Sequence, residues 1–348
     1  MYTAISKVAS VLLLAALTAN AQAQQAVTMQ AVVMQDGKVS LREVTRPTAK
    51  AGEVLVKIRA AGVHPIHWKM ASGYSGPPRA SNAPIPAGAP SMPPANSAPR
   101  VVGADYAGVV AAVGSGVTTF KVGDAVIANS GEGYAEYAVA KAEDVVLKPS
   151  KLSFAEAAAL PGVAVTVWNS IVDVANIKVG QKILIHGAAG GTGSSAVQIA
   201  KARGAYVIGT ASARNHDYLR SIGADQVIDY NTERFEDRVS NVDVVLNTAN
   251  LETATRSIKV VKKGGYLMSI AGIPDEQECA AAGITCAVRD MESPTSSPRV
   301  MQEILQLVQA GKYSVNVDKT FPLSAYQQAW DYGKLGHTRG KIVLTVGN

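Results

Sequence analysis

The chain has 348 residues, of which 47% are hydrophobic and 17% charged, so it is long enough for two domains with buried cores. Its formal net charge is +6, but lysine and arginine are scattered along the sequence, and we therefore expect no nucleic-acid binding. A mild positive excess fits a small anionic ligand at least as well.

Residues 1–23 have the pattern of a secretory signal peptide. Lys7 precedes an apolar run over 8–19, and Ala21-Gln22-Ala23 places small residues where signal peptidase reads them. The run is shorter than the roughly 20 residues that a membrane-spanning helix needs, so we expect no membrane span. We predict cleavage before Gln24 and Sec-type export to the periplasm or the medium. If the segment is an ordinary apolar tail instead, the protein is cytoplasmic.

Residues 27–150 have the pattern of a β-rich domain. Apolar runs at 31–34 and 53–58 are separated by Gly and Pro, and short strand patterns resume over 101–147. Residues 75–99 consist mainly of Pro, Ala, Ser and Gly without periodicity, which predicts a surface loop or insert.

From residue 151 onward, helical and strand patterns alternate. Ser153 is placed to cap a helix that begins at Phe154. Strand patterns follow at 183–186, 207–210, 227–229, 242–247 and 265–270. This alternation predicts a parallel sheet with crossover helices. A helix is expected over 301–310 and a final strand over 341–346.

A glycine-rich turn joins the first of these strands to a helical pattern. It reads A-x-G-x-x-G, with Ala188, Gly190 and Gly193 at the fixed positions. Gly190 lets the backbone approach a pyrophosphate, Gly193 lets the helix pack on the strand, and the helix N-terminus offers N–H groups to phosphates. The context predicts a dinucleotide site that includes Gly191 and Thr192. A tight turn in another α/β protein is the structural alternative.

The end of the second strand of this unit indicates which dinucleotide is bound. An acidic residue there would accept the ribose 2′-hydroxyl of NAD, but Thr210 is followed by Ala-Ser-Ala-Arg. Ser212 can donate to a 2′-phosphate, and Arg214 can pair with it. We therefore expect NADP(H), although Arg214 is also placed as an ordinary solvated residue at a helix start.

The chain has two cysteines, Cys279 and Cys286. In an oxidising compartment they can close a small loop as a disulfide, and free buried thiols are the alternative. The predicted signal peptide favours the disulfide.

An ordered series of motifs resembles the medium-chain dehydrogenase/reductase superfamily, and most closely its zinc-free, quinone-oxidoreductase-like branch of NADP-dependent, alcohol dehydrogenase-like proteins. The motifs are Ala61-Gly62-Val63-His64-Pro65, Phe120-Lys121-Val122-Gly123-Asp124-Ala125-Val126, Gly133-Tyr134-Ala135-Glu136-Tyr137, Ala157-Ala158-Ala159-Leu160-Pro161, Ile222-Gly223-Ala224-Asp225, Lys263-Gly264-Gly265 and Arg339-Gly340-Lys341-Ile342-Val343-Leu344.

The resemblance implies an α/β fold with two domains. Residues 27–150 and 291–348 would form a GroES-like β-rich catalytic domain, with 75–99 as its insert. Residues 151–290 would form a Rossmann cofactor domain with a doubly wound parallel sheet. The active site is then expected in the cleft between them, at the carboxyl ends of the strands, and a homodimer is the family expectation.

The resemblance also implies further cofactor contacts. Thr166 and the loop residues Asn247 and Ala271 are expected near the nicotinamide half, and Tyr230 is expected in the adenosine pocket. Arg339 and Lys341 are expected to reach the cofactor phosphates.

Catalytic zinc is not expected. In zinc-containing relatives the ligands are a Cys, a His and a later Cys, and the corresponding positions here resemble His64, Ala104 and Gly162. One candidate ligand of three does not hold zinc with an open fourth position. His64 and His67 are three residues apart, which suggests a metal pair, but no third ligand is evident.

A zinc-free reductase needs hydrogen-bond donors at the substrate oxygen and an acid that supplies a proton. Tyr74 matches a tyrosine that the family places at the cleft and is the first candidate. His64 and His67 are the alternatives, because imidazole titrates near neutral pH. The branch usually has Asn and Asp at these two positions, and both histidines are equally suited to packing.

The expected function is NADPH-dependent reduction of a quinone or of an α,β-unsaturated ketone or aldehyde. Reversible alcohol–carbonyl oxidoreduction is the second candidate, which the missing zinc ligands weaken. An exported, non-catalytic protein with vestigial cofactor binding is the third, because little NADPH is found outside the cytoplasm.

Overall fold

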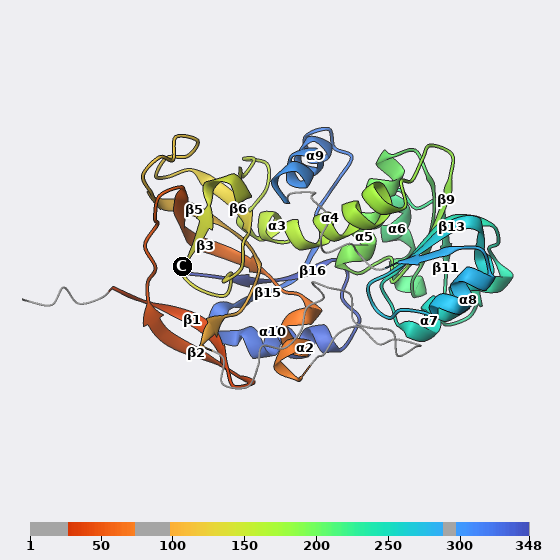
Figure 1. Ribbon diagram of the computed structural model, residues 1–348, viewed down its shortest axis with the longest axis horizontal. Coiled ribbons are helices and arrows are strands. Elements are labelled where there is room, and N and C mark those ends of the chain that lie inside the picture. The colour runs from red at the N-terminus through yellow and green to blue at the C-terminus, as the bar shows by residue number, and fades with distance from the viewer. Residues whose placement is uncertain (1–26, 74–97, 288–296, 348) are drawn as a thin grey trace, which may run out of the picture.

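The computed structural model describes residues 27–73, 98–287 and 297–347, which form two halves built on separate sheets (Figure 1). In the first half, a seven-stranded sheet has the order β15-β16-β3-β5-β6-β8, with β7 paired to β3, and a three-stranded sheet has the order β2-β1-β4. The strands of this half are β1 (Thr28–Gln35), β2 (Lys38–Thr45), β3 (Glu53–Gly62), β4 (Arg100–Val101), β5 (Asp105–Val113), β6 (Ala125–Asn129), β7 (Tyr137–Lys141), β8 (Val145–Leu147), β15 (Val317–Pro322) and β16 (Lys341–Thr345).

The second half is a six-stranded parallel sheet with the order β11-β10-β9-β12-β13-β14. Its strands are β9 (Lys182–His186), β10 (Tyr206–Thr210), β11 (Gln226–Ile228), β12 (Val242–Asn247), β13 (Val261–Ser269) and β14 (Thr285–Ala287). Counted from the first strand, this is the 3-2-1-4-5-6 order of a doubly wound Rossmann sheet. The predicted fold class is therefore confirmed.

Helices surround both sheets. The α-helices are α2 (Pro65–Ala71), α3 (Phe154–Ala158), α4 (Pro161–Val167), α5 (Gly191–Ala202), α6 (His216–Ser221), α7 (Leu251–Ser257), α8 (Glu276–Ala281), α9 (Ser297–Gln309) and α10 (Tyr326–Lys334). Short 3-10 turns are η1 (Ala142–Asp144), η3 (Ala213–Asn215), η4 (Phe235–Asp237), η5 (Ile258–Val260) and η6 (Leu323–Ala325), and η2 (Trp168–Val174) is a π-helix that continues α4. The predicted cap at Ser153 is present, because its hydroxyl accepts the Glu156 N–H and the Glu156 carboxylate accepts the Ser153 N–H.

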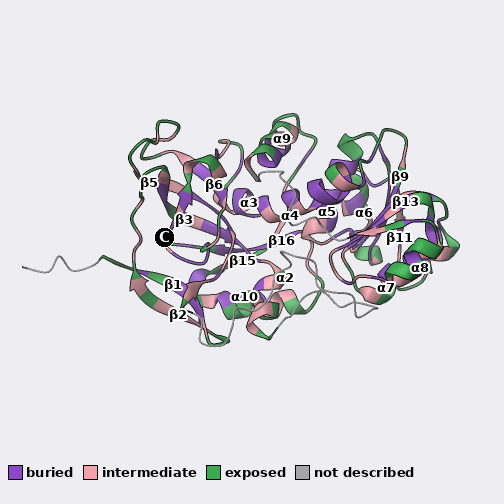
Figure 2. Cartoon of the chain, viewed as in Figure 1, coloured by how far each residue is buried: buried purple, intermediate pink, exposed green. Residues whose placement is uncertain are grey.

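The parallel sheet is covered on both faces, as the buried apolar residues of its central strands require. One face packs against α5 and α6 through residues such as Ile199 and Leu219, and the other packs against Phe235 and Cys279. Figure 2 shows the buried strands inside each half and the exposed outer surface of α8. Helix α9 packs against α4. The segment that follows the last strand of the parallel sheet therefore completes the hydrophobic core on that face of the sheet.

The C-terminal strands return to the first half, so both ends of the chain build it. Strand β16 pairs antiparallel with β3 in register Val343↔Gly62. Immediately before β16, Gly340 donates its N–H to the carbonyl of Ala189 at 2.8 Å, which joins the end of the chain to the glycine-rich turn. The predicted domain boundary at residue 290 lies outside the described residues.

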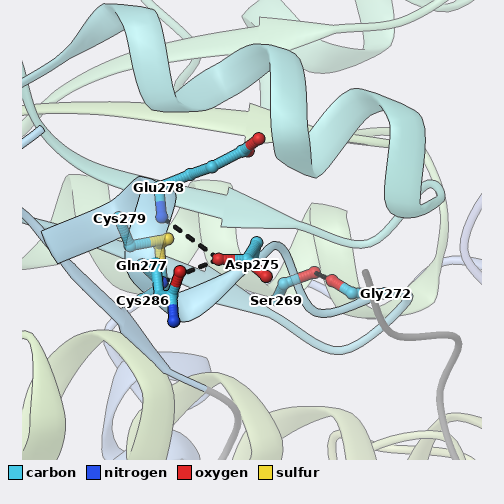
Figure 3. The surroundings of a disulfide bond; sticks show 7 residues. All are labelled: Ser269, Gly272, Asp275, Gln277, Glu278, Cys279 and Cys286. Atoms are coloured by element: carbon cyan, nitrogen blue, oxygen red, sulfur yellow. Dashed lines mark hydrogen bonds between the residues drawn. A yellow bond between two sulfur atoms is a disulfide. The ribbon is translucent and has the colours of Figure 1, made fainter. Parts of the chain in front are cut away.

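Cys279 of α8 and Cys286 of β14 form a disulfide, which confirms the favoured alternative (Figure 3). The Asp275 carboxylate caps α8 by accepting the N–H groups of Gln277 and Glu278. The bridge therefore ties this short helix to the last strand of the parallel sheet.

Throughout 27–73, 98–287 and 297–347, every helix is too short or too polar to cross a bilayer. Three predictions concern residues outside the described ranges. They are the signal peptide at 1–23, the first catalytic candidate Tyr74, and residues 75–97 of the 75–99 insert.

Candidate active site

A cavity of about 1350 Å³ opens at the carboxyl ends of the parallel strands and is lined from both halves of the molecule. Its walls include the glycine-rich turn, the loops after β10, β12 and β13, and the segment 63–69 of the first half. The cavity is larger than the 300–1,000 Å³ typical of drug-sized ligand sites, so it has room for a dinucleotide and a second molecule.

Gly190, Gly191, Thr192 and Gly193 line this cavity at the start of α5. Among the described atoms, a Cβ placed on Gly190 comes within 4 Å of the Gly187 carbonyl oxygen alone, at 3.5 Å. A Cβ on Gly193 lies 2.2 Å from the same oxygen. The two glycines therefore serve different purposes: Gly190 leaves space at the cavity wall, whereas Gly193 lets the helix close onto the turn.

Ala188, the third residue of the fingerprint, is fully buried and does not lie in the cavity wall. A Cβ on Gly209 of β10 comes 2.9 Å from the Ala188 methyl group, so this methyl group packs beneath the turn. The predicted contact of Ala188 with the cofactor is thus replaced by a supporting position.

Ser212, Arg214 and Tyr230 lie together at the cavity wall after β10 and β11. The Arg214 guanidinium donates to the carbonyl of His337 at 3.2 Å, and the side chain is otherwise exposed at the rim. Ser212 and Arg214 thus bring a hydroxyl and a cation to the wall of the cavity, and their contact with a ribose 2′-phosphate stays a prediction.

Arg339 lies behind this rim and is not part of the cavity wall. Its guanidinium donates to the Asn215 side-chain oxygen at 3.0 Å and to the Arg214 carbonyl at 2.9 Å, and it stacks over the Tyr218 ring at 5.4 Å. Since these contacts hold its charged end against the Arg214–Asn215 turn, the geometry gives Arg339 a supporting position instead of the predicted phosphate contact.

Thr166 and Ala271 line the cavity from α4 and from the loop after β13. Asn247 does not, because its fully buried amide donates to Ser269 Oγ at 2.8 Å and to the Asn250 carbonyl at 2.9 Å. The neighbouring segment 248–250 reaches the cavity in its place. Asn247 thus organises the loop that the sequence expects to meet the nicotinamide.

His64 is the first polar side chain on the substrate side of the cavity. It ends the loop after β3 and precedes α2, whose first residue is Pro65. Its Nε2 lies 2.5 Å from Asp105 Oδ2, and the ring lines the cavity with a 17% exposed side chain. His64 can therefore contact a ligand in the cavity while Asp105 fixes the orientation of its ring.

Asp105 is fully buried and receives hydrogen bonds from several directions. The Gly162 N–H donates to Oδ2 at 2.9 Å, and the Asn129 amide donates to Oδ1 at 2.5 Å. Burial alone would raise the pKa of Asp105, but the charge and hydrogen bond of His64, with Lys341 and the Gly162 N–H, hold it below its ordinary value. Asp105 is therefore a buried carboxylate that favours a positive charge on its neighbours.

Lys341 completes this group from the start of β16. Its ammonium donates to the Val63 carbonyl at 2.7 Å and lies 3.2 Å from His64 Nε2. Burial lowers the pKa of Lys341 to about 8, against the opposing effect of Asp105. We call His64, Asp105, Asn129 and Lys341 the substrate-side cluster.

His67 lines the cavity, and its ring is also in hydrogen-bond contact with a buried side chain. Its Nδ1 lies 2.8 Å from the hydroxyl of Tyr134, a residue with no exposed surface. Burial, assisted by the charges of His64 and Lys341, holds the pKa of His67 well below its ordinary value. Its ring is therefore neutral at physiological pH, which makes it a weaker acid candidate than His64.

The sequence did not single out Asp105, Asn129 or Tyr134. Asp105 carries one recognisable signal, since it is an acidic residue at the first position of a strand that is otherwise apolar. Asn129 is at the end of its strand and offers no such signal.

Two of the three positions that correspond to zinc ligands in zinc-containing relatives, His64 and Gly162, come together. A Cβ on Gly162 would lie 2.6 Å from the His64 ring and 2.8 Å from Asp105 Oδ2. The His64–Asp105 pair therefore occupies the space that a ligand side chain at 162 would need. Within the described ranges, no group of three or more His, Cys, Asp or Glu side chains is arranged to hold a metal ion.

Comparisons with known proteins follow the same pattern. Residues 50–150 match the alcohol dehydrogenase GroES-like domain, and residues 222–344 match the zinc-binding dehydrogenase family. The chain is 33% identical over 318 residues to the chloroplastic quinone-oxidoreductase homolog of Spinacia oleracea, covering 87% of this chain and 92% of that protein.

A second relative is the chloroplastic NADPH-dependent alkenal/one oxidoreductase of Arabidopsis thaliana, 32% identical over 312 residues, or 86% of this chain and 73% of that one. The structure of the quinone oxidoreductase from Coxiella burnetii superposes with a TM-score of 0.75 at 27% identity, covering 92% of this chain and all of that chain. The chain therefore belongs to the medium-chain dehydrogenase/reductase superfamily, in its zinc-free quinone-oxidoreductase-like branch, and is an oxidoreductase with a nicotinamide cofactor.

Proposed function

We propose that the protein reduces a conjugated carbonyl, either a quinone or an α,β-unsaturated ketone or aldehyde, with NADPH and without a metal ion. The observation that carries this proposal is one cavity lined both by the glycine-rich turn and by the His64–Asp105 pair. The names of the two relatives, a quinone-oxidoreductase homolog and an alkenal/one oxidoreductase, support this substrate class.

The described residues fit a dinucleotide diphosphate. Gly190 leaves open space at the cavity wall, and the first turn of α5 carries no acidic residue, so its N–H groups and helix dipole favour an anion there. Ser212 and Arg214 supply a donor and a cation for a 2′-phosphate, and no carboxylate stands between Thr210 and Arg214. These features favour NADPH over NADH.

When bound, NADPH supplies a hydride from its nicotinamide C4. Addition of this hydride to the β-carbon of an enone moves the C=C electron pair, and negative charge appears on the carbonyl oxygen. His64 lies in the cavity wall with its Nε2 2.5 Å from Asp105 Oδ2, so its imidazole can hold the proton that this oxygen takes. His64 then recovers a proton from solvent, and the enol becomes the saturated ketone.

The test is consumption of NADPH by the purified protein, offered 1,4-benzoquinone or a simple enone in the absence of added metal, with NADH in parallel. Faster turnover with NADPH than with NADH supports both substrate class and cofactor choice. Binding of NADPH, seen by its fluorescence, without turnover of either acceptor would overturn the substrate class. Absence of binding would overturn the enzyme proposal and favour a vestigial, non-catalytic role.

We also infer that the protein is exported. The composition of residues 1–23 and the Cys279–Cys286 disulfide support this inference, because structural disulfides persist in oxidising compartments. The intact mass of the protein isolated from its native cells is the test. A chain that begins at Gln24 supports export, and a chain that begins at Met1 contradicts it.

A further inference from the structure

Lys341 connects the two parts of the cavity. Its aliphatic stem lies over the glycine-rich turn, where a Cβ on Gly191 would come 2.6 Å from Lys341 Cδ. Its ammonium is on the other side, bound to the Val63 carbonyl at 2.7 Å and beside His64. Only 6% of the residue is exposed, so the ammonium is fixed by protein instead of moving freely in the cavity.

The Lys341 ammonium and the Asp105 carboxylate both lie beside the His64 ring. Lys341 Nζ is 3.2 Å from His64 Nε2 and 3.4 Å from Nδ1, while Asp105 Oδ2 faces the same ring at 2.5 Å. When both Lys341 and His64 are protonated, two positive charges lie 3.2 Å apart, and Asp105 is the carboxylate that the described residues place in contact with the ring. Such like-charge contact is costly where water is largely excluded.

Three further residues beside this group, all in the described part of the chain, add no negative charge to it. His67, on the same helix start, is kept neutral by burial and contributes no negative charge. The Gly162 N–H and the Asn129 amide both donate to Asp105 and are uncharged. Loss of a proton from His64 therefore removes the unfavourable contact with Lys341.

We propose that Lys341 is a positioning residue that orients His64 and drives its proton toward the substrate oxygen, and that it is not a ligand of the cofactor phosphates. This inference rests on the proposed function. The step is balanced: a C–H bond forms at the β-carbon as the C4–H bond of NADPH breaks, which would leave NADP⁺. The C=C pair moves toward the carbonyl, and the His64 proton forms the O–H bond of the enol. Lys341 transfers no proton in this step and acts through its charge.

Three variants test the inference in the full protein. Lys341→Met keeps the stem over Gly191 and removes the charge, Lys341→Arg keeps a charge, and Lys141→Met, at an exposed site on β7, is the matched control. NADPH affinity is measured by fluorescence, and kcat and kcat/KM are measured across pH with benzoquinone or an enone.

For Lys341→Met we expect an NADPH Kd within about twofold of wild type, a kcat reduced by roughly tenfold, and an alkaline fall of activity displaced upward by roughly one pH unit. The displacement is upward because His64 keeps its proton to higher pH once the neighbouring charge is gone. Lys341→Arg restores the wild-type profile in part, and Lys141→Met leaves it unchanged. A Kd raised by roughly tenfold or more with an unmoved pH profile would show that Lys341 is a phosphate ligand and overturn the inference.

A titration of the histidines by NMR separates this result from failure of the proposed function. The chain has five histidines, and His64→Asn identifies the His64 signal. If wild type binds NADPH but turns over neither acceptor, the proposed substrate class fails. An upward displacement of the His64 titration in Lys341→Met still supports the coupling, and an unmoved titration overturns it.

Discussion

The imidazole Nδ1 of His67 lies 2.8 Å from the hydroxyl of Tyr134, and the two rings meet edge to face with centroids 4.9 Å apart. Both residues are buried, and burial raises the pKa of Tyr134 and lowers that of His67. The hydroxyl therefore stays protonated and the ring stays neutral, which is the arrangement of a structural hydrogen bond. His64 is the N-cap of α2 and His67 lies in its first turn. Of the two, His64 is the candidate for proton transfer.

Replacing each of the two histidines by asparagine tests these separate roles of His64 and His67. His67→Asn leaves the buried Tyr134 hydroxyl without its ring partner, and we expect a loss of about 1–3 kcal/mol in the free energy of unfolding, with kcat within a few-fold of wild type. His64→Asn removes the proposed acid, and we expect kcat to fall by roughly 10²- to 10⁴-fold. Urea unfolding and steady-state kinetics on both proteins are the measurements. A His67→Asn protein that is as stable as wild type but inactive would contradict the assignment.

The strands and the main functional turn were predictable because their signals are local. The apolar run at 183–186, the Ser153 cap and the glycine spacing from 188 to 193 each lie within a few residues of chain. Their structural consequences depend on backbone geometry and short-range burial, which a sequence pattern records directly.

The contacts that define the substrate side could not be predicted in this way. His64 meets Asp105 across 41 residues and Lys341 across 277, and nothing in either local sequence indicates the pairing. The same limit explains Arg339, whose guanidinium is taken up by Asn215 and the Arg214 carbonyl 124 and 125 residues away. The roles of Tyr74 and the 75–99 insert, the signal peptide and the homodimer stay predictions.

Two glycines of the turn offer a matched pair of substitutions. Gly190→Ala adds a methyl group at the cavity wall without a close backbone contact, so we expect a folded protein whose NADPH Kd rises by about tenfold or more. Gly193→Ala places its methyl group 2.2 Å from the Gly187 carbonyl oxygen, so we expect a loss of about 1–3 kcal/mol in stability before any effect on binding. Thermal unfolding and NADPH fluorescence distinguish the two. Equal loss of stability in both variants would refute the separate roles.

The choice of cofactor depends on Arg214 at the cavity rim. Arg214→Ala removes the cation proposed for the 2′-phosphate, and we expect kcat/KM with NADPH to fall by about 10- to 100-fold while that with NADH changes little. Arg220→Ala is the control, because this exposed arginine on α6 pairs with Asp217 and lies outside the cavity wall. A parallel fall with both cofactors in Arg214→Ala would show that the residue does not read the 2′-phosphate.

Acid sensitivity follows from His186 at the end of β9. Its Nδ1 and Nε2 lie 3.1 Å from Thr210 Oγ1 and 3.0 Å from Ser257 Oγ, and burial, with Arg256 nearby, lowers the pKa of His186 to about 3. Between pH 6.5 and 3 the unfolded chain binds a proton at this residue that the folded protein does not bind. The stability contributed by neutral His186 is therefore complete above pH 6.5 and is lost as the pH falls toward 3.

Urea unfolding of wild type and His186→Gln, measured from about pH 7 to about pH 4, isolates this effect. We expect the free energy of unfolding of wild type to fall more steeply than that of the variant, by up to about 1.4 kcal/mol per pH unit below pH 6.5. His67, whose pKa is also lowered, adds the same sign to both proteins and cancels in the difference. Identical slopes in the two proteins would exclude His186 as a source of acid sensitivity.

The Cys279–Cys286 disulfide closes a loop of seven residues between α8 and β14. In the chain-entropy treatment, a loop of this length restricts the unfolded state enough to stabilise the fold by about 2–3 kcal/mol. We therefore expect dithiothreitol to lower the midpoint of urea unfolding of wild type and to leave unchanged that of a Cys279→Ser, Cys286→Ser double variant. Because Cys279 is buried on the face of the sheet that α8 covers, the oxidised wild type is expected to be the most stable of the three forms. If dithiothreitol lowered the unfolding midpoint equally in wild type and in the double variant, the destabilisation would not come from this disulfide. If dithiothreitol left the midpoint of wild type unchanged, the disulfide would not stabilise the fold.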